Sequence, residues 1–137
     1  MRVFVDTSAI IAMLDDSQND HELAGTLWRE LRRTDAELLT SNYVVVEAYA
    51  LIQRRFGMLV AQSLASSTVP LMDVHWIDAD LHRRATEAWL RANRRRLSFV
   101  DCVSFVLIRQ VGVEYALAFD KHFETEGFPL PPLAARP

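Results

Sequence analysis

Several kinds of residue are scarce in this sequence, and each scarcity excludes something. Cys102 is the only cysteine, so no disulfide can form within the chain, which fits a reducing compartment and predicts a cytoplasmic protein. No stretch approaches the roughly 18 consecutive apolar residues that a membrane-spanning helix needs. Asp6, Asp15 and Asp16 interrupt the first apolar stretch, so we also expect no secretory leader.

Lysine is nearly absent. Lys121 is the only one, so almost all positive charge is carried by arginine, although the net charge of -3 is not typical of a nucleic-acid binder. The planar guanidinium group suits phosphate recognition. For any one cluster of arginines, a solvated helix face is the plainer interpretation. The clusters are Arg29/Arg32/Arg33, Arg54/Arg55, Arg83/Arg84 and Arg91/Arg94/Arg95/Arg96.

The pattern of apolar residues predicts a single α/β domain spanning residues 1–137. Predicted strands cover residues 2–5, 37–40, 71–77 and 115–119. Predicted helices cover residues 9–14, 21–33, 43–56, 59–65, 80–94 and 99–111, with a last turn at 121–126. Because helices separate the strands, we expect a parallel sheet with helices on both faces. The proline-rich tail, residues 129–137, leaves a fifth edge strand open.

Four acidic residues occupy unusual places. Asp6 and Asp120 each end an apolar strand, whereas Glu47 and Asp101 lie inside apolar stretches. Each of three acids has a purely structural explanation: Asp6 and Asp120 can cap the helices that follow, and Asp101 fits a capping box that begins at Ser98. These explanations stay open for each residue taken alone.

Glu47 is harder to explain as a structural residue. It shares one helix face with Val44, Ala48 and Leu51, so its carboxylate lies on an apolar stripe. Burying an unpaired carboxylate costs several kcal/mol. A cation is therefore expected beside it, either an arginine or a metal ion.

Considered together, the four acids indicate a shared binding site. In a doubly wound sheet, all four positions lie near the carboxyl edge, where such folds bind ligands. Carboxylate oxygens suit Mg²⁺ or Mn²⁺. The histidines lack zinc-type spacing, and packing is the expected role of His21, His75, His82 and His122.

Four motifs carry a resemblance to a known family. They are the opening VFVDTSAIIAML, the helix SNYVVVEAYALI, the segment LSFVDCVSF and the late strand ALAFDKHF. In this order and at these separations, they resemble the PIN domain ribonucleases, and among them the toxin subunits of VapBC toxin–antitoxin pairs. The resemblance implies a three-layer α/β/α fold with a central parallel sheet of four or five strands.

The resemblance also implies a function and a site. It implies Mg²⁺- or Mn²⁺-dependent hydrolysis of RNA phosphodiester bonds by the toxin of a type II toxin–antitoxin system. The implied partners are an RNA substrate, a VapB-like antitoxin and a second copy in a homodimer, without a membrane. The catalytic and metal-binding acids map onto Asp6, Glu47, Asp101 and Asp120. Supporting positions map onto Thr7, Ser8 and Ser98, and the arginines expected to contact RNA are Arg94, Arg95 and Arg96.

Other functions remain open at this point. A degenerate PIN module that only binds a partner is disfavoured because all four acids are kept. A phospho-acceptor or phosphatase domain with Asp6 as nucleophile is disfavoured because Ser8 stands where a haloacid-dehalogenase-type enzyme prefers a second acid. A PIN nuclease that works in RNA processing without an antitoxin is not distinguished by the sequence.

Overall fold

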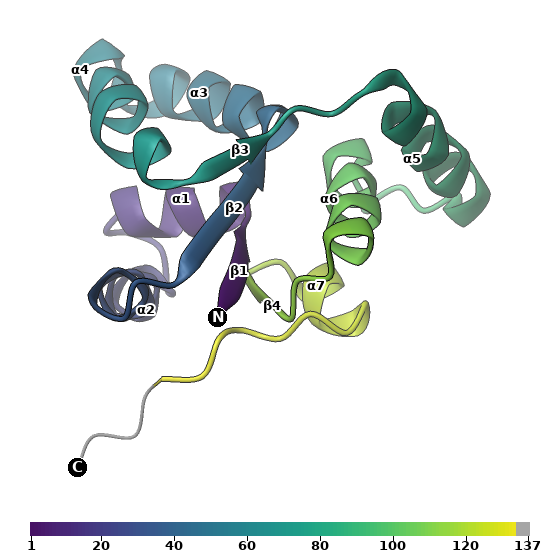
Figure 1. Ribbon diagram of the computed structural model, residues 1–137. Coiled ribbons are helices and arrows are strands. Elements are labelled where there is room, and N and C mark those ends of the chain that lie inside the picture. Colours follow the sequence, from purple (N-terminus) through teal and green to yellow (C-terminus); the bar gives the residue numbers. More distant parts are fainter. Residues whose placement is uncertain (134–137) are drawn as a thin grey trace.

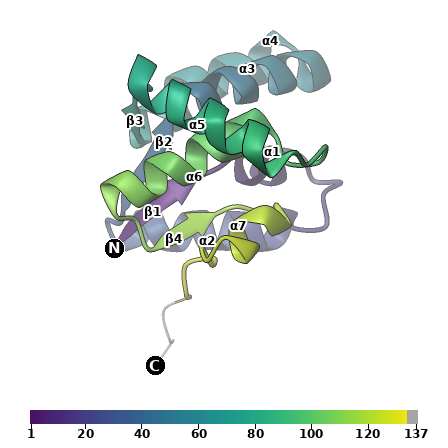
Figure 2. The ribbon, with the colours of Figure 1, turned by 90° about the vertical axis from the view of Figure 1, so that its right-hand side faces the viewer.

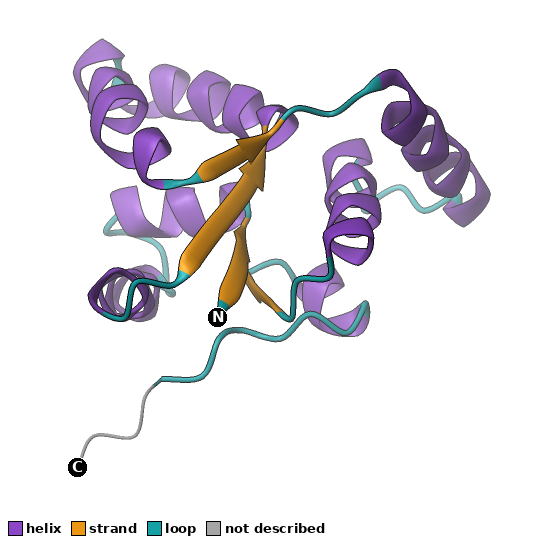
Figure 3. Cartoon of the chain, viewed as in Figure 1, coloured by secondary structure: helices purple, strands orange, loops and turns teal. Residues whose placement is uncertain are grey.

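A four-stranded parallel sheet forms the centre of the protein. We describe it from a computed structural model, in which residues 1–133 are placed (Figures 1 and 3). The strand order is β3-β2-β1-β4, so the chain leaves β1 in one direction for β2 and β3 and returns on its other side as β4. The strands are β1 (Arg2–Val5), β2 (Glu37–Ser41), β3 (Asp73–His75) and β4 (Tyr115–Leu117).

Helices cover both faces of this sheet. The helices of the first two crossovers lie on one side, and α6 lies on the other side with α5 packed against its outer surface (Figure 1). In Figure 2, α5, α6 and α7 stand in front of the sheet. The helices are α1 (Thr7–Leu14), α2 (His21–Arg33), α3 (Asn42–Phe56), α4 (Met58–Ser63), α5 (Ala79–Ala92), α6 (Phe99–Val111) and α7 (Lys121–Thr125).

The layers are held by apolar side chains that are almost completely buried. Phe4 of β1 is stacked on Phe123 of α7, and Ile10, Ile52 and Ile108 bring α1, α3 and α6 into the same core. All five are at most 1% exposed. The predicted fold class, a three-layer α/β/α arrangement with a parallel sheet, is therefore confirmed.

Helix ends follow the sequence signals that predicted them. The Ser41 hydroxyl accepts a hydrogen bond from the Val44 N–H at the start of α3. Gly112 ends α6 with a φ of 74°, a left-handed conformation that favours glycine. Two predicted helices, residues 21–33 and 99–111, match α2 and α6 at both ends.

Several predicted boundaries are wrong by one or more residues, with the largest differences in four elements. The helix predicted at 59–65 begins at Met58 and continues as a π-helical turn (Leu64–Thr68) and a 3-10 turn (Val69–Leu71), so the polar residues and Pro70 do not stop helical structure. That continuation shortens the strand predicted at 71–77 to three residues. The fourth strand is also shorter than predicted: after the Asp6 N–H donates to the Leu117 carbonyl, the Phe119 N–H donates to the Ser8 hydroxyl and not to the backbone of β1. The helix predicted at 80–94 ends at Ala92, where Asn93 adopts a left-handed conformation.

The tail contains no fifth strand among residues 129–133. Residues 129–133 make one backbone hydrogen bond to the sheet, in which the Ala116 N–H of β4 donates to the Pro129 carbonyl at 3.0 Å. Residues 134–137 of the predicted tail lie outside the described residues. Among residues 1–133, no helix is both long and apolar enough to cross a membrane.

Candidate metal centre

The first acid sits where the strand order of the sheet reverses. Asp6 follows β1, and its N–H donates to the Leu117 carbonyl of β4 at 3.1 Å. Its carboxylate caps α1 by accepting a hydrogen bond from the Ser8 N–H at 3.1 Å. Open α/β sheets bind ligands at this kind of reversal, outside the carboxyl ends of the strands. The capping role and a ligand-binding role are compatible, because a carboxylate offers about four acceptor sites.

Ser8 ties the first acid to the last one. The Ser8 hydroxyl donates to Asp6 Oδ2 at 2.6 Å and accepts a hydrogen bond from the Phe119 N–H at 2.9 Å. Asp120 follows directly, and its carboxylate caps α7 by accepting from the His122 N–H at 3.0 Å. The turn after β1 and the turn after β4 are therefore fixed to each other through one hydroxyl group.

The third acid comes from the start of α6. The Ser98 hydroxyl accepts from the Asp101 N–H at 3.0 Å, which is the predicted cap of this helix. The Asp101 side chain points into the interior, because the residue is only 6% exposed. Ligand atoms of Asp101, Asp120 and His122 lie within 4.8 Å of one another, a spacing that suits a shared metal ion.

Burial and mutual repulsion act on these carboxyl groups. Burial raises the pKa of Asp6 to about 6, against the lowering effect of its hydrogen bonds to Ser8 and with a further rise from the charge of Glu47. Burial also raises the pKa of Asp101, and the charges of Asp6 and Asp120 raise it further. These interactions connect Glu47 with Asp6, Asp6 with Asp101 and Asp101 with Asp120, and we call the four residues, in this order, the acid row. Glu47 reaches it from α3 and is half-buried.

No arginine or lysine side chain neutralises the acid row. Within residues 1–133, none of its members forms an ion pair with an arginine or the lysine, and the one basic neighbour is the His122 ring, whose Nε2 lies 3.9 Å from Asp120 Oδ1. The arginine partner considered for Glu47 is therefore not present in the described chain. The hydroxyl of Thr7, next to Asp6, is buried without a hydrogen-bond partner there. Buried, mutually repelling oxygen donors without a cation are what a divalent metal ion requires.

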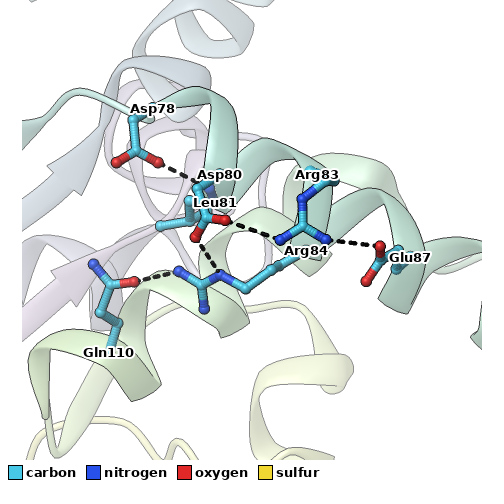
Figure 4. A network of polar contacts seen from close by, with 7 residues as sticks. All are labelled: Asp78, Asp80, Leu81, Arg83, Arg84, Glu87 and Gln110. Carbon is cyan, nitrogen blue, oxygen red and sulfur yellow. Dashed lines mark hydrogen bonds and ion pairs between the residues drawn. The ribbon is translucent and has the colours of Figure 1, made fainter.

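Arg83 and Arg84, which form another of the arginine clusters, already make ion pairs and hydrogen bonds within the protein. Arg83 contacts Asp80 and Glu87, both at 2.9 Å, and Arg84 contacts Asp80 at 3.0 Å and also donates to Gln110 (Figure 4). These contacts match the plainer interpretation of arginine clusters as solvated helix faces. They leave little of either guanidinium group for a phosphate.

The arginines that were predicted to contact RNA lack such partners among the described residues. Arg94, Arg95 and Arg96 are exposed in the loop between α5 and α6, and among the described residues their side chains form no ion pair or hydrogen bond. The His122 ring lies against this loop, with Nε2 3.2 Å from the Arg96 carbonyl oxygen. The loop therefore lies beside the Asp120 end of the acid row.

At the opposite end of the acid row lies an apolar hollow. It has a volume of about 320 Å³ and is lined by Asn42, Tyr43, Val46, Glu47 and Val100. Val46 is 65% exposed, although it is a large apolar residue. The acids therefore have an apolar surface beside Glu47 and a basic loop beside Asp120.

Sequence reasoning did not find His122, which it assigned to packing. Zinc-type spacing was the wrong criterion, because His122 joins the site as a single histidine two residues after an acid that ends a strand. Its side chain is 19% exposed and faces both Asp120 and the arginine loop. Cys102, by contrast, is buried in α6 as part of the hydrophobic core, and burial raises the pKa of its thiol.

Known proteins resemble this chain over most of its length. Residues 3–127 match the family model described as PIN domain. Proteins named 23S rRNA-specific endonuclease VapC20, from Mycobacterium tuberculosis strains CDC 1551 / Oshkosh and ATCC 25618 / H37Rv, are each 36% identical over 129 residues, covering 92% of this chain and 95% of the relative. The crystal structure of Mycobacterium tuberculosis VapC20, described as a sarcin-ricin loop cleaving toxin, matches with a TM-score of 0.77 and 33% identity, covering 92% of this chain and 95% of that one.

These similarities agree with the family that the four sequence motifs resemble. Both the sequence match and the structural match extend over more than nine-tenths of the chain. The chain belongs to the PIN domain family and, within it, to the group of VapC toxins.

Proposed function

We propose that this protein is a Mg²⁺- or Mn²⁺-dependent ribonuclease and the toxin of a type II toxin–antitoxin pair. The observation that carries the proposal is the acid row: four carboxylates from four separate chain segments act on one another at the sheet edge without an arginine or lysine partner among residues 1–133. A module that only binds a partner has no need for such an arrangement, which costs folding energy. That cost argues against the degenerate-module alternative.

The residues of the acid row would hold the metal, with Asp6 and Asp101 as the most buried ligands. A divalent ion held by these carboxylates would supply Lewis-acid polarisation of the phosphate and a lower pKa for a bound water. Ser8 fixes the orientation of the Asp6 carboxylate through its 2.6 Å hydrogen bond. Asp101 has to lose its proton before it can serve as a ligand. Hydrolysis of this kind leaves 5′-phosphate and 3′-hydroxyl ends, and no residue of the chain acts as a nucleophile.

The arginine loop would bring RNA to this acidic centre. Arg94, Arg95 and Arg96 are the basic cluster that lies beside the acid row and has no partner in the described chain. Guanidinium groups that neutralise phosphates supply affinity that falls as salt rises. Ribosomal RNA, the substrate in the name of the 36% identical relatives, is the first substrate to test.

Further parts of the proposal concern partners and location. We propose that a VapB-like antitoxin silences the protein, that the protein forms a homodimer, and that it acts in the cytoplasm. The VapC relatives and the single buried cysteine support these statements. The apolar sides of α2 and α3 are only partly available to a partner, because Leu27, Leu31 and Ile52 belong to the core, whereas Leu23 and Phe56 are 39% and 36% exposed.

RNA cleavage by substituted proteins tests the function. The assay compares the parent with Asp6→Asn and Asp101→Asn in Mg²⁺ and in Mn²⁺, because asparagine keeps the shape of each side chain and removes its charge. Both variants are expected to lose at least 100-fold in rate. Asp16→Asn, at an exposed position after α1, is the matched control and should cleave like the parent. Equal rates in all four proteins would reject the metal-site proposal.

A further inference from the structure

His122 connects two parts of the site that are 26 residues apart in the sequence. Its backbone N–H donates to Asp120 Oδ1 at 3.0 Å, and its ring Nε2 lies 3.2 Å from the Arg96 carbonyl oxygen. The side chain is 19% exposed, so the ring is held between the start of α7 and the arginine loop. One residue therefore contacts both the last acid and the backbone of the expected RNA track.

The partner of the ring decides what the histidine does. A carbonyl oxygen is only an acceptor, so Nε2 must carry the hydrogen in this bond. A nitrogen that donates a hydrogen bond has no lone pair left for a metal ion. His122 lies within metal-ligand distance of Asp101 and Asp120, and its bond to Arg96 engages Nε2 while Nδ1 keeps a lone pair, so the experiment below has to separate a role at the loop from a role at the metal.

The arginine loop depends on few other contacts. The Leu97 N–H donates to the Arg94 carbonyl at 3.1 Å and the Leu97 side chain is buried, while Asn93 and Ser98 fix the adjoining helix ends. The three arginine side chains themselves make no hydrogen bond or ion pair within the described chain. The bond from His122 therefore links the loop backbone to the Asp120 end of the acid row, beside the link that Ser98 makes to Asp101.

We propose that His122 is a positioning residue, which holds the Arg94–Arg96 loop beside the acid row so that its guanidinium groups meet the phosphates of bound RNA. This inference rests on the proposed function of the loop. It predicts that His122 acts on RNA affinity through the arginines. It also predicts that metal dependence does not pass through His122.

The experiment measures RNA binding with a fluorescein-labelled single-stranded RNA in EDTA, where cleavage is not expected. His122→Gln keeps an amide N–H donor, whereas His122→Met has nearly the same size and no donor. His122→Met is expected to raise Kd about 3- to 10-fold, the range of one lost hydrogen bond. His122→Gln should restore most of the affinity. Circular dichroism verifies that both variants are folded, and the Gln–Met difference excludes a general effect of losing the ring.

A double-mutant comparison tests the route through the arginines. In a protein that already carries Arg94/Arg95/Arg96→Ala, His122→Met should change Kd less than twofold, because its effect passes through groups that are gone. His21→Ala is the control: His21 also contacts a backbone carbonyl, that of Ala12 at 2.7 Å, and it contacts no part of the arginine loop. It should leave Kd unchanged.

Three results would overturn the inference in distinguishable ways. An unchanged Kd for His122→Met, beside a raised Kd for the triple arginine variant, would reject the role of His122 alone. An unchanged Kd for the triple arginine variant would reject the RNA track and this inference with it. An increased Mg²⁺ requirement for cleavage by His122→Met, with Kd in EDTA unchanged, would make His122 a metal ligand instead. Absence of cleavage by the parent would reject the ribonuclease proposal, while the binding series would still test His122.

Discussion

Asp6 should destabilise the metal-free protein at neutral pH. Its carboxyl group is 4% exposed, and burial raises its pKa from 3.8 to about 6. Keeping such a group ionised in the folded state costs about 3 kcal/mol at pH 8. Asparagine is equally good at an N-cap and carries no charge. Asp6→Asn should therefore increase the free energy of unfolding in EDTA at pH 8 by about 2–3 kcal/mol.

The pH dependence of this gain has a definite sign. A carboxyl group with a raised pKa in the folded state favours folding below its unfolded pKa and loses that contribution as the pH rises through about 6. The advantage of the asparagine variant should therefore be largest at pH 8 and fall to about 0.5 kcal/mol at pH 4. Urea unfolding of both proteins at each pH gives the difference, which includes a smaller rise in the pKa of Asp101 once the charge of Asp6 is removed.

Two comparisons make the experiment decisive. Asp16→Asn removes an exposed carboxylate, so it should change the unfolding free energy by less than about 0.5 kcal/mol. Saturating Mn²⁺ should stabilise the parent and not Asp6→Asn, since only the parent keeps the ligand. Equal stability of the parent and Asp6→Asn at pH 8, or a gain as large at pH 4 as at pH 8, would refute the electrostatic reasoning.

Other predictions concern single contacts. Ser8→Ala removes the bridge between Asp6 and the Phe119 N–H, so urea unfolding should show a loss of about 1–3 kcal/mol together with slower RNA cleavage. Gly112→Ala places a side chain at a φ of 74°, which should cost about 1–2 kcal/mol in the same assay. Arg83→Ala should leave RNA affinity unchanged, because this arginine is paired within α5, and a salt-dependent loss of affinity would contradict that assignment.

The parts of the fold that the sequence predicted best are those with strong local signals. The helices at 21–33 and 99–111 have apolar residues at helical spacing, and Ser98 and Gly112 mark both ends of the second one. Asp6, Glu47, Asp101 and Asp120 were also assigned to one edge, because the carboxyl ends of parallel strands and the helix starts that follow them lie together. Their catalytic roles stay predictions.

The errors arose where tertiary structure overrides local preference. Ser66, Ser67 and Pro70 are usual at a helix end, yet the chain continues through a π-helical and a 3-10 turn because Leu64 is buried there in the core. The edge strand β3 is short, with Trp76 directly after it 80% exposed. His122 escaped detection because its partner is a backbone carbonyl, which no pattern of side chains reveals.

The rate of RNA cleavage as a function of added Mn²⁺ tests the central claim most directly. The protein is first stripped with EDTA, and the parent is compared with Asp101→Asn. The acid row predicts no cleavage by the stripped parent, saturable recovery with Mn²⁺, and at least a tenfold higher Mn²⁺ requirement or no recovery for Asp101→Asn. Cleavage by the parent that persists in EDTA, or a variant that recovers at the same Mn²⁺ concentration and rate as the parent, would contradict it.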